Sequence, residues 1–281
     1  MHRFGGYFVA IASVLLLLAV MNLAAAPKAD LWPRWERNDP DSTETVDHSS
    51  WDLFLSRYLV AGHPSGINRV RYGDVTAEDR RKLEDYIGDL QAVAVSELNR
   101  DEQMAYWINL YNAVTIEIVL DHYPVSSITR IDISPGLFSR GPWDAEVLNI
   151  EGEVLSLNDV EHRILRPVWQ DPRVHYAVNC ASIGCPNLQS KAYTGANLEG
   201  LLDKGAREYV NHPRGASFQG ERLVLSSIYD WFQEDFSGSE EGVLRHLRRY
   251  AAPELEAKLA GYSGRIGYQY DWSLNDWGLN D

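Results

Sequence analysis

Basic side chains are scarce in this sequence, and so are cysteines and long apolar runs. The 26 Lys and Arg are outnumbered by 40 Asp and Glu, which gives a formal net charge of −14. Nucleic acids and anionic lipid surfaces attract basic proteins, so we expect no nucleic acid as a partner and no electrostatic attachment to a membrane. Composition excludes a low-complexity or collagen-like chain, since 45% of the residues are hydrophobic. That share supports a sizeable core in a chain of 281 residues.

The one long apolar run, Phe8–Leu23, predicts a targeting segment. Arg3 precedes the run, and three alanines at 24–26 resemble a small-residue cleavage site. Pro27 would hinder cleavage there, and the run is close to the minimum length for a membrane span. Residues 1–26 are therefore expected to be a signal peptide or an N-terminal membrane anchor. In either case the protein is exported, and it is either periplasmic or anchored to the inner membrane facing the periplasm. Membrane contact is expected only through this segment.

Residues 27–281 are expected to form one domain preceded by a linker. Residues 27–49 are polar and rich in turn-forming residues, which is typical of a linker. Residues 50–281 contain no internal repeat and no further linker. Helical and strand patterns alternate there without regular βαβ spacing, and the predicted strands, such as 128–133, are short. We therefore expect a single α+β domain, with a mostly antiparallel sheet packed against several helices.

One predicted helix is long and buried. Asn99 can cap it, Glu102 follows three residues later, and Pro124 stops it. The helix is apolar nearly all round, which indicates burial. Asn109 and Asn112 then lie in the interior and need hydrogen-bond partners. They either hold a neighbouring loop or present an amide to a functional site.

Both cysteines occur in the stretch 171–188, together with a histidine. The alternation over 174–179 predicts a strand that ends in a loop of small residues between Cys180 and Cys185. In a regular strand His175 and Cys180 point to opposite faces and lie about 16 Å apart at ~3.3 Å per residue. His162, on a predicted helix that Ser156 caps, is therefore a second candidate partner for a cysteine.

Five segments, in order, resemble the signature blocks of the domain of unknown function 547 family (DUF547). They are AYWINLYNAVTI (105–116), SLNDVEHRILR (156–166), DPRVHYAVNCASIGCPNL (171–188), SSIYDWFQEDF (226–236) and YDWSLND (270–276). The resemblance spans roughly residues 50 to 276. It implies an exported bacterial protein and no particular substrate. The family's histidine and cysteine positions carry over onto His162, His175, Cys180 and Cys185.

These residues predict thiol catalysis, because a cysteine nucleophile needs a base and a group that orients the base. We expect Cys180 as nucleophile, with Cys185 as the substitute, and His175 or His162 as base. Candidate orienting groups are Asn109, Asn112 and Glu102. The loop after Cys180 can also offer free backbone N–H groups to an oxyanion. The predicted reaction is that of a hydrolase or acyl transferase acting on an amide or thioester.

Two alternatives involve the same residues. An exported protein reaches a compartment that oxidises thiols, which favours a Cys180–Cys185 disulfide. Such a disulfide would make the domain a non-catalytic periplasmic binding or scaffold module. A zinc site formed by His162, His175, Cys180 and Cys185 is a weaker alternative, because zinc sites usually contain tighter pairs such as C-x2-C. We therefore expect no metal and no cofactor.

Overall fold

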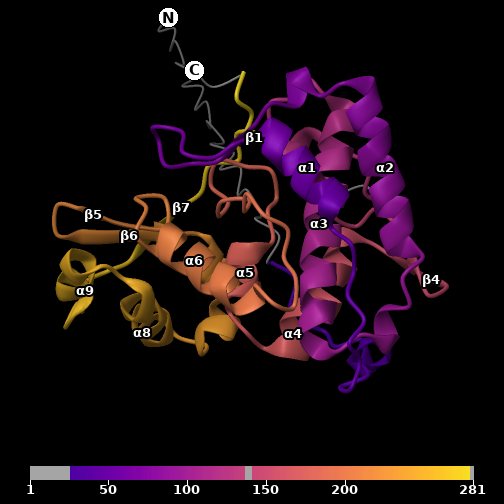
Figure 1. Ribbon diagram of the computed structural model, residues 1–281. Helices are drawn as coiled ribbons and strands as arrows, with labels where there is room; N and C mark the ends of the chain where they lie inside the picture. Colours follow the sequence, from indigo (N-terminus) through magenta and orange to yellow (C-terminus); the bar gives the residue numbers. More distant parts are fainter. Residues whose placement is uncertain (1–25, 137–140, 279–281) are drawn as a thin grey trace, which may run out of the picture.

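A long buried helix, α3 (Arg100–His122), is the element against which the N-terminal half of the chain packs (Figure 1). The computed structural model describes residues 26–136 and 141–278. Asn99 caps α3 as predicted, since its Oδ1 accepts a hydrogen bond from the Glu102 N–H at 3.0 Å. Every residue from 102 to 116 is buried, so the prediction of a buried helix is confirmed.

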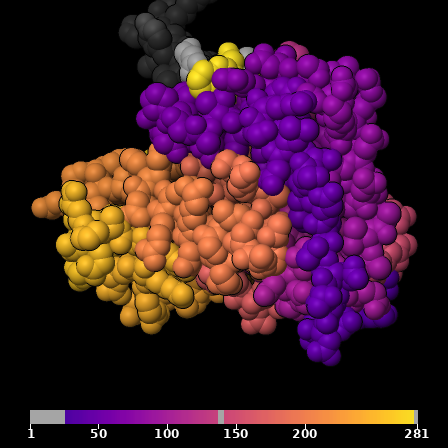
Figure 2. Space-filling model, in the orientation of Figure 1, coloured from indigo at the N-terminus to yellow at the C-terminus, as the bar shows by residue number. Residues whose placement is uncertain are grey.

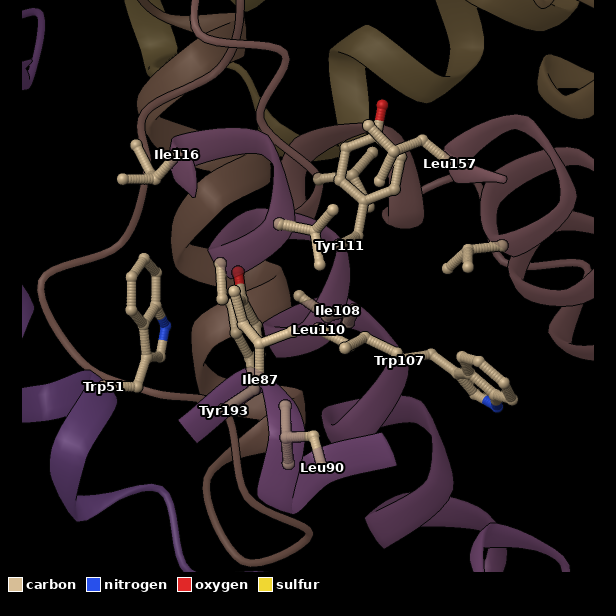
Figure 3. Close-up of a cluster of buried hydrophobic side chains, with 14 of the residues drawn as sticks. Trp51, Ile87, Leu90, Trp107, Ile108, Leu110, Tyr111, Ile116, Leu157 and Tyr193 are labelled. Atoms are coloured by element: carbon tan, nitrogen blue, oxygen red, sulfur yellow. The ribbon is translucent and has the colours of Figure 1, made fainter. Parts of the chain in front are cut away.

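Two further helices, α1 (Ser49–Tyr58) and α2 (Ala77–Gln91), complete the first hydrophobic core around α3. Thr76 caps α2 by accepting a hydrogen bond from the Asp79 N–H at 3.1 Å. Figure 3 shows Trp51 of α1 and Trp107 of α3 on opposite sides of the view, with other side chains of α2 and α3 between them. This core fixes α3 on all sides and makes it a rigid support for the loops that follow.

Within residues 26–136 and 141–278, the strands form three small sheets rather than one larger sheet. β1 (Leu59–Val60) pairs with β2 (Arg69–Val70), β3 (Leu148–Ile150) pairs with β4 (Glu153–Leu155), and β5 (Ala216–Gln219) pairs with β6 (Arg222–Ser226). These three pairs are antiparallel, and β7 (Gly267–Gln269) adds to β6 in parallel. The predicted α+β class with mainly antiparallel pairing is therefore confirmed.

The C-terminal half has a second hydrophobic core. Its helices are α6 (Leu198–Val210), α7 (Ile228–Trp231), α8 (Glu240–Tyr250) and α9 (Pro253–Leu259). Figure 2 shows this half, in orange and yellow, beside the indigo and magenta half, with yellow C-terminal residues against the indigo. The Val70 N–H donates to the Asn275 carbonyl at 2.9 Å, which explains that contact. The C-terminal segment thus joins the two halves.

Short helices fill several connections. In the part of the chain that the structure describes, five of them are 3-10 helices: η1 (Pro33–Glu36), η2 (Tyr72–Asp74), η3 (Val95–Glu97), η4 (Ile128–Arg130) and η6 (Gln233–Phe236). After Ser156 the chain forms a π-helix, η5 (Asp159–Leu165), which continues into α4 (Arg166–Trp169). Pro167 lies within the first turn of α4, where proline is tolerated.

Two strand predictions are wrong. Residues 128–133 contain η4, and residues 174–179 contain α5 (Val174–Ala177) followed by extended chain. Every residue from 174 to 179 is buried. The segment therefore has no solvent-exposed face whose period would distinguish a strand from a short helix. The estimate of about 16 Å between His175 and Cys180 assumed a strand and no longer applies.

Residues 27–36, here called the N-terminal strap, lie along η5. The Asp30 N–H donates to the His162 carbonyl at 2.9 Å, and the Trp32 N–H donates to the Arg163 carbonyl at 3.0 Å. Trp35 is 3% exposed and packs in the first core. The predicted targeting segment, residues 1–26, lies outside the described residues except for Ala26. Within residues 26–136 and 141–278, no helix is both long and apolar enough to cross a membrane.

Candidate active site

The two cysteines meet at the end of α5, in a segment here called the cysteine loop (residues 179–186). Their Sγ atoms lie 2.9 Å apart, and both thiols are free. Cys180 is partly exposed, whereas Cys185 is only 4% exposed. Cys180 is therefore the more exposed of the two residues.

The side chain of Asn179 holds the cysteine loop in a tight turn. Its Oδ1 accepts a hydrogen bond from the Ala181 N–H at 2.9 Å, and its Nδ2 donates to the Pro186 carbonyl at 2.7 Å. Ala181 adopts a φ of 56°, which is uncommon for a residue with a side chain. The Cys185 N–H donates to the Ser182 carbonyl at 3.1 Å. Together these bonds return the chain to Cys180 and bring the two sulfurs together.

The C-terminal segment 270–276 forms one wall of the cysteine loop. The Ile183 N–H donates to the Ser273 carbonyl, and the Gly184 N–H donates to the Asp271 carbonyl, both at 2.8 Å. A Cβ at position 184 would lie 2.9 Å from the Asp271 backbone, so this close approach requires glycine. In Figure 1 the yellow chain passes from β7 up to this region. The segment therefore fixes the loop from a distant part of the sequence.

Two hydroxyl groups surround the Cys180 sulfur. The Tyr270 hydroxyl lies 3.1 Å and the Ser182 hydroxyl 3.2 Å from Sγ, and the two hydroxyls are 2.9 Å apart. Burial by itself would raise the pKa of Cys180. Hydrogen bonds from Cys185, Ser182 and Tyr270 to the ionised sulfur outweigh burial and lower the pKa of Cys180 below its ordinary value. The arrangement thus favours a thiolate at Cys180.

The buried cysteine has the opposite acidity. Burial, together with its hydrogen bond to Cys180 and the charge of that neighbour, raises the pKa of Cys185 well above its ordinary value. The Cys180 N–H donates to the Cys185 sulfur at 3.0 Å. The N–H groups of Cys180 and Ala181 are therefore both engaged, whereas the sequence suggested that N–H groups here would be free for an oxyanion.

The two histidines are bound to other groups. His175 Nε2 lies 2.6 Å from Asp235 Oδ2, and its ring stacks on Phe232 with centroids 4.4 Å apart. His162 Nδ1 lies 3.0 Å from Arg166 Nη1, and burial lowers the pKa of His162. Within the part of the chain that the structure describes, neither histidine hydrogen-bonds a cysteine sulfur. The structure brings the two cysteines together but does not pair either one with a histidine.

The histidines belong to a buried group of charges, here called the charge cluster: Glu161, His162, Arg166, His175 and Asp235. Glu161 Oε1 lies 3.8 Å from His175 Nδ1 and 4.0 Å from His162 Nδ1. Arg166 Nε donates to Asp235 Oδ2 at 2.6 Å. Burial alone would raise the pKa of Asp235, but hydrogen bonds from His175 and Arg166 lower it to about 2. The cluster therefore has carboxylate acceptors for its cationic and imidazole donors.

Glu161 connects the charge cluster to α3 and affects the thiol electrostatically. Its Oε2 accepts a hydrogen bond from the Tyr111 hydroxyl at 3.1 Å. Its negative charge opposes ionisation of Cys180, although less than burial does. Glu161 lies on η5, and π-helical turns often occur at functional sites.

Comparison with models of known protein families identifies one matching family. Residues 95–210 match the family model described as "Protein of unknown function, DUF547". These residues form a DUF547 domain within the chain. The match confirms the resemblance to this family over residues 95–210, which include α3, η5, α5 and both cysteines. No curated protein and no solved structure matches the chain.

Within the DUF547 domain, Asn109 and Asn112 bind backbone groups. Asn112 donates to the Ala177 carbonyl at 3.0 Å and accepts from the Asn179 N–H at 2.8 Å. Asn109 bonds both backbone groups of Tyr193, at 2.7 and 3.0 Å. The first alternative drawn from the sequence, that these amides hold neighbouring loops, describes the observed contacts. Asn112 in particular fixes the chain that leads from α5 to Cys180.

Glu102 also binds backbone groups of the domain. Its carboxylate accepts hydrogen bonds from the Val46 N–H at 2.8 Å and the Gly195 N–H at 2.7 Å. It orients neither His162 nor His175 in this structure. In the described residues, no group of three or more His, Cys, Asp or Glu side chains is arranged to hold a metal ion.

Sequence reasoning missed two residues of the candidate site, Ser182 and Tyr270. Ser182 lies in the small-residue loop that had been noted, and Tyr270 begins the last signature block. No sequence signal connects Tyr270 to Cys180, because 90 positions separate them. Partly exposed aromatic rings lie beside Tyr270: its ring centroid is 4.6 Å from that of Trp272 and 4.9 Å from that of Trp231.

Proposed function

We propose that this DUF547 domain is a cysteine-dependent hydrolase or acyl transferase acting on an amide or thioester, with Cys180 as nucleophile. The observation that carries the proposal is the environment of its sulfur. Cys180 is partly exposed and lies within hydrogen-bond distance of Ser182, Cys185 and Tyr270. A thiolate is the nucleophilic form of cysteine, and hydrogen bonds to the ionised form increase its population.

The same hydroxyls provide a route through the reaction. As the C–S bond forms, the carbonyl π electrons move to the substrate oxygen. The hydroxyls of Tyr270 and Ser182 can then donate their hydrogen bonds to that oxygen instead of to the sulfur. Collapse of the intermediate breaks the bond to the leaving group, which takes a proton from Tyr270. Water, or an acceptor amine or alcohol, then attacks the thioester, and its proton returns to Tyr270. Thiolate formation and proton transfer are then both supported by groups already in contact with the sulfur.

We propose a positioning role for His175 and His162 in this reaction. Their hydrogen bonds within the charge cluster support that role, because His175 lies on α5, four residues before the cysteine loop begins. The bond to Asp235 holds α5 against η6. Service as the general base would require either histidine to leave its present partner.

We also propose that the protein is exported and is either periplasmic or anchored to the inner membrane. The apolar run at residues 8–23 supports this proposal. Fractionation of cells that express the full chain tests it. Recovery of the protein in the cytoplasm would contradict the proposal.

The alternative function is a non-catalytic periplasmic binding or scaffold module with a Cys180–Cys185 disulfide. The 2.9 Å separation of the sulfurs supports this alternative. Thiol titration of protein purified without reductant separates the two functions. Absence of a free thiol would favour the alternative, whereas two titratable thiols would favour catalysis.

Labelling with a panel of thiol-directed activity probes tests the catalytic proposal directly. The wild type is compared with Cys180→Ala and Cys185→Ala, and thermal unfolding checks that each variant is folded. We expect Cys180→Ala to abolish labelling and Cys185→Ala to retain labelling at Cys180. Unchanged labelling in both variants would end the proposal.

A further inference from the structure

We infer that Cys180 and Cys185 form a reversible dithiol–disulfide couple, which reduces low-molecular-weight disulfides as a second activity of the cysteine loop. The inference shares one premise with the proposed function, namely that Cys180 is a reactive thiol. It goes beyond that function because it assigns a chemical role to Cys185 and a second class of substrate.

The backbone brings the two sulfurs together. Asn179 closes the loop at both ends, and Ser182 accepts the Cys185 N–H. The segment 270–276 and the Tyr209 hydroxyl hold Gly184 in between. A disulfide needs about 2.05 Å between sulfurs, so the observed 2.9 Å must shorten by only about 0.9 Å. Small side-chain movements within the fixed loop can therefore form the bond.

The two cysteines differ in exposure as the roles require. Cys180 is partly exposed and can meet a disulfide from solvent, whereas Cys185 is 4% exposed and can reach only Cys180. Cys180 is the attacking cysteine, and its lowered pKa agrees with that role. Cys185 is the resolving cysteine. Tyr270, whose hydroxyl contacts the Cys180 sulfur, packs against the rings of Trp231 and Trp272, and this bulk beside the thiol favours a small disulfide over a folded protein as substrate.

Two groups support Cys185 when it becomes a thiolate. The Cys180 N–H already donates to its sulfur at 3.0 Å. Arg214 lies nearby and is half-buried, and it donates to Asn187 Oδ1 at 2.7 Å. The guanidinium of Arg214 interacts favourably with a negative charge on Cys185. These contacts favour the charged form of Cys185 and thus counteract the effect of burial, which keeps its thiol protonated.

The exchange balances in two steps. The Cys180 thiolate attacks one sulfur of the substrate disulfide, forming a mixed disulfide and releasing the first substrate sulfur as a thiolate, which takes the proton that Cys185 loses. The Cys185 thiolate then attacks the Cys180 sulfur and releases the second substrate thiolate, which takes a proton from water. Two electrons pass from the cysteine pair to the substrate disulfide. The products are two substrate thiols and a Cys180–Cys185 disulfide.

Mass spectrometry of the reduced protein after reaction with oxidised glutathione tests this inference. We expect the wild type to lose two hydrogens without retaining glutathione. Cys185→Ser should retain one glutathionyl group on Cys180, because nothing resolves the mixed disulfide. Cys180→Ser should react at least about tenfold more slowly, since its remaining thiol is buried. A persistent adduct on the wild type, or equal rates in Cys180→Ser and the wild type, would overturn the inference.

Two further measurements cover the case of a misfolded variant and separate the redox inference from the proposed acyl transfer. Should Cys185→Ser fail to fold, acid quenching of the wild-type reaction at early times must reveal the mixed disulfide on Cys180, and its absence would count against the mechanism. Labelling of the reduced wild type with an acyl-donor probe then tests the proposed function separately. Labelling without disulfide formation refutes only the redox couple. Disulfide formation without labelling refutes only acyl transfer.

Discussion

The hydroxyl of Tyr270 lies 3.1 Å from the sulfur of Cys180, although 90 positions separate the two residues. This contact joins the C-terminal segment to the cysteine loop. It explains how a partly buried thiol can be acidic without a histidine partner, because a hydroxyl donor stabilises the charged sulfur.

Removal of the Tyr270 hydroxyl is expected to slow the reaction of Cys180 with iodoacetamide. Tyr270→Phe deletes one donor to the thiolate, and a hydrogen bond worth about 0.5–1.5 kcal/mol corresponds to roughly a two- to tenfold loss of rate at pH 7. The rate profile against pH should also move to higher pH, because the pKa of Cys180 rises. Tyr268→Phe is the matched control, since the Tyr268 hydroxyl lies 3.5 Å from Glu240. Equal losses in the two variants would refute a specific role for Tyr270.

Asn112→Ala is expected to destabilise the domain by about 2–4 kcal/mol in urea unfolding. The substitution leaves the buried Ala177 carbonyl and Asn179 N–H without the partners they have in the structure. Asn158→Ala is the control, because Asn158 bonds Asp144 at the surface and its loss should cost less than about 1 kcal/mol. A small effect of Asn112→Ala would show that this amide does not anchor the cysteine loop.

Asp235 is expected to make stability depend on pH in the acid range. The pKa of Asp235 is about 2 in the folded protein, below its ordinary value, so its contribution is present above about pH 4 and is lost as the pH falls towards 2. The contribution is about 2 kcal/mol at neutral pH. In chemical unfolding, the difference between wild type and Asp235→Asn should therefore shrink by about this amount between pH 5 and pH 2. The exposed Asp230→Asn serves as control, and a difference independent of pH would contradict this assignment.

Glu117→Gln is expected to stabilise the domain at pH 8 and to have little effect below pH 5. Burial, with the charges of Asp121 and Glu84, raises the pKa of Glu117 to about 7. A raised pKa in the folded state means that stability is lost as the pH rises towards 7, because the charged form is disfavoured on folding. After allowance for solvent screening of this half-buried group, the gain at pH 8 is about 1 kcal/mol. Denaturation at both pH values measures it, and an equal gain at both would count against a titrating carboxyl.

Local signals in the sequence predicted the long buried helix correctly. Asn99 caps α3 as its spacing from Glu102 indicated, because a capping bond involves residues only three apart. The region 174–179 failed because burial on all sides removes the polar face that separates a strand from a helix. The wrong strand prediction was the basis for the expectation that His175 and Cys180 lie far apart on opposite faces.

The candidate site was predicted only in part. The two cysteines were selected because they lie close together in sequence, and the structure brings them into contact. The partners of the histidines could not be predicted, because Asp235 lies 60 positions from His175 and only the tertiary fold joins them. Ser182 and Tyr270 were missed because a hydroxyl has no distinctive spacing relative to a thiol.

The position of Tyr270 late in the chain also determines when the thiol becomes acidic. During synthesis the cysteine loop is completed well before residues 270–276 are added, and the hydrogen bond from Tyr270 requires that segment to pack against the loop. A nascent chain, or one that crosses a membrane unfolded, therefore carries Cys180 with the acidity of an ordinary cysteine. Reactivity would arise only once residues 270–276 pack against the loop.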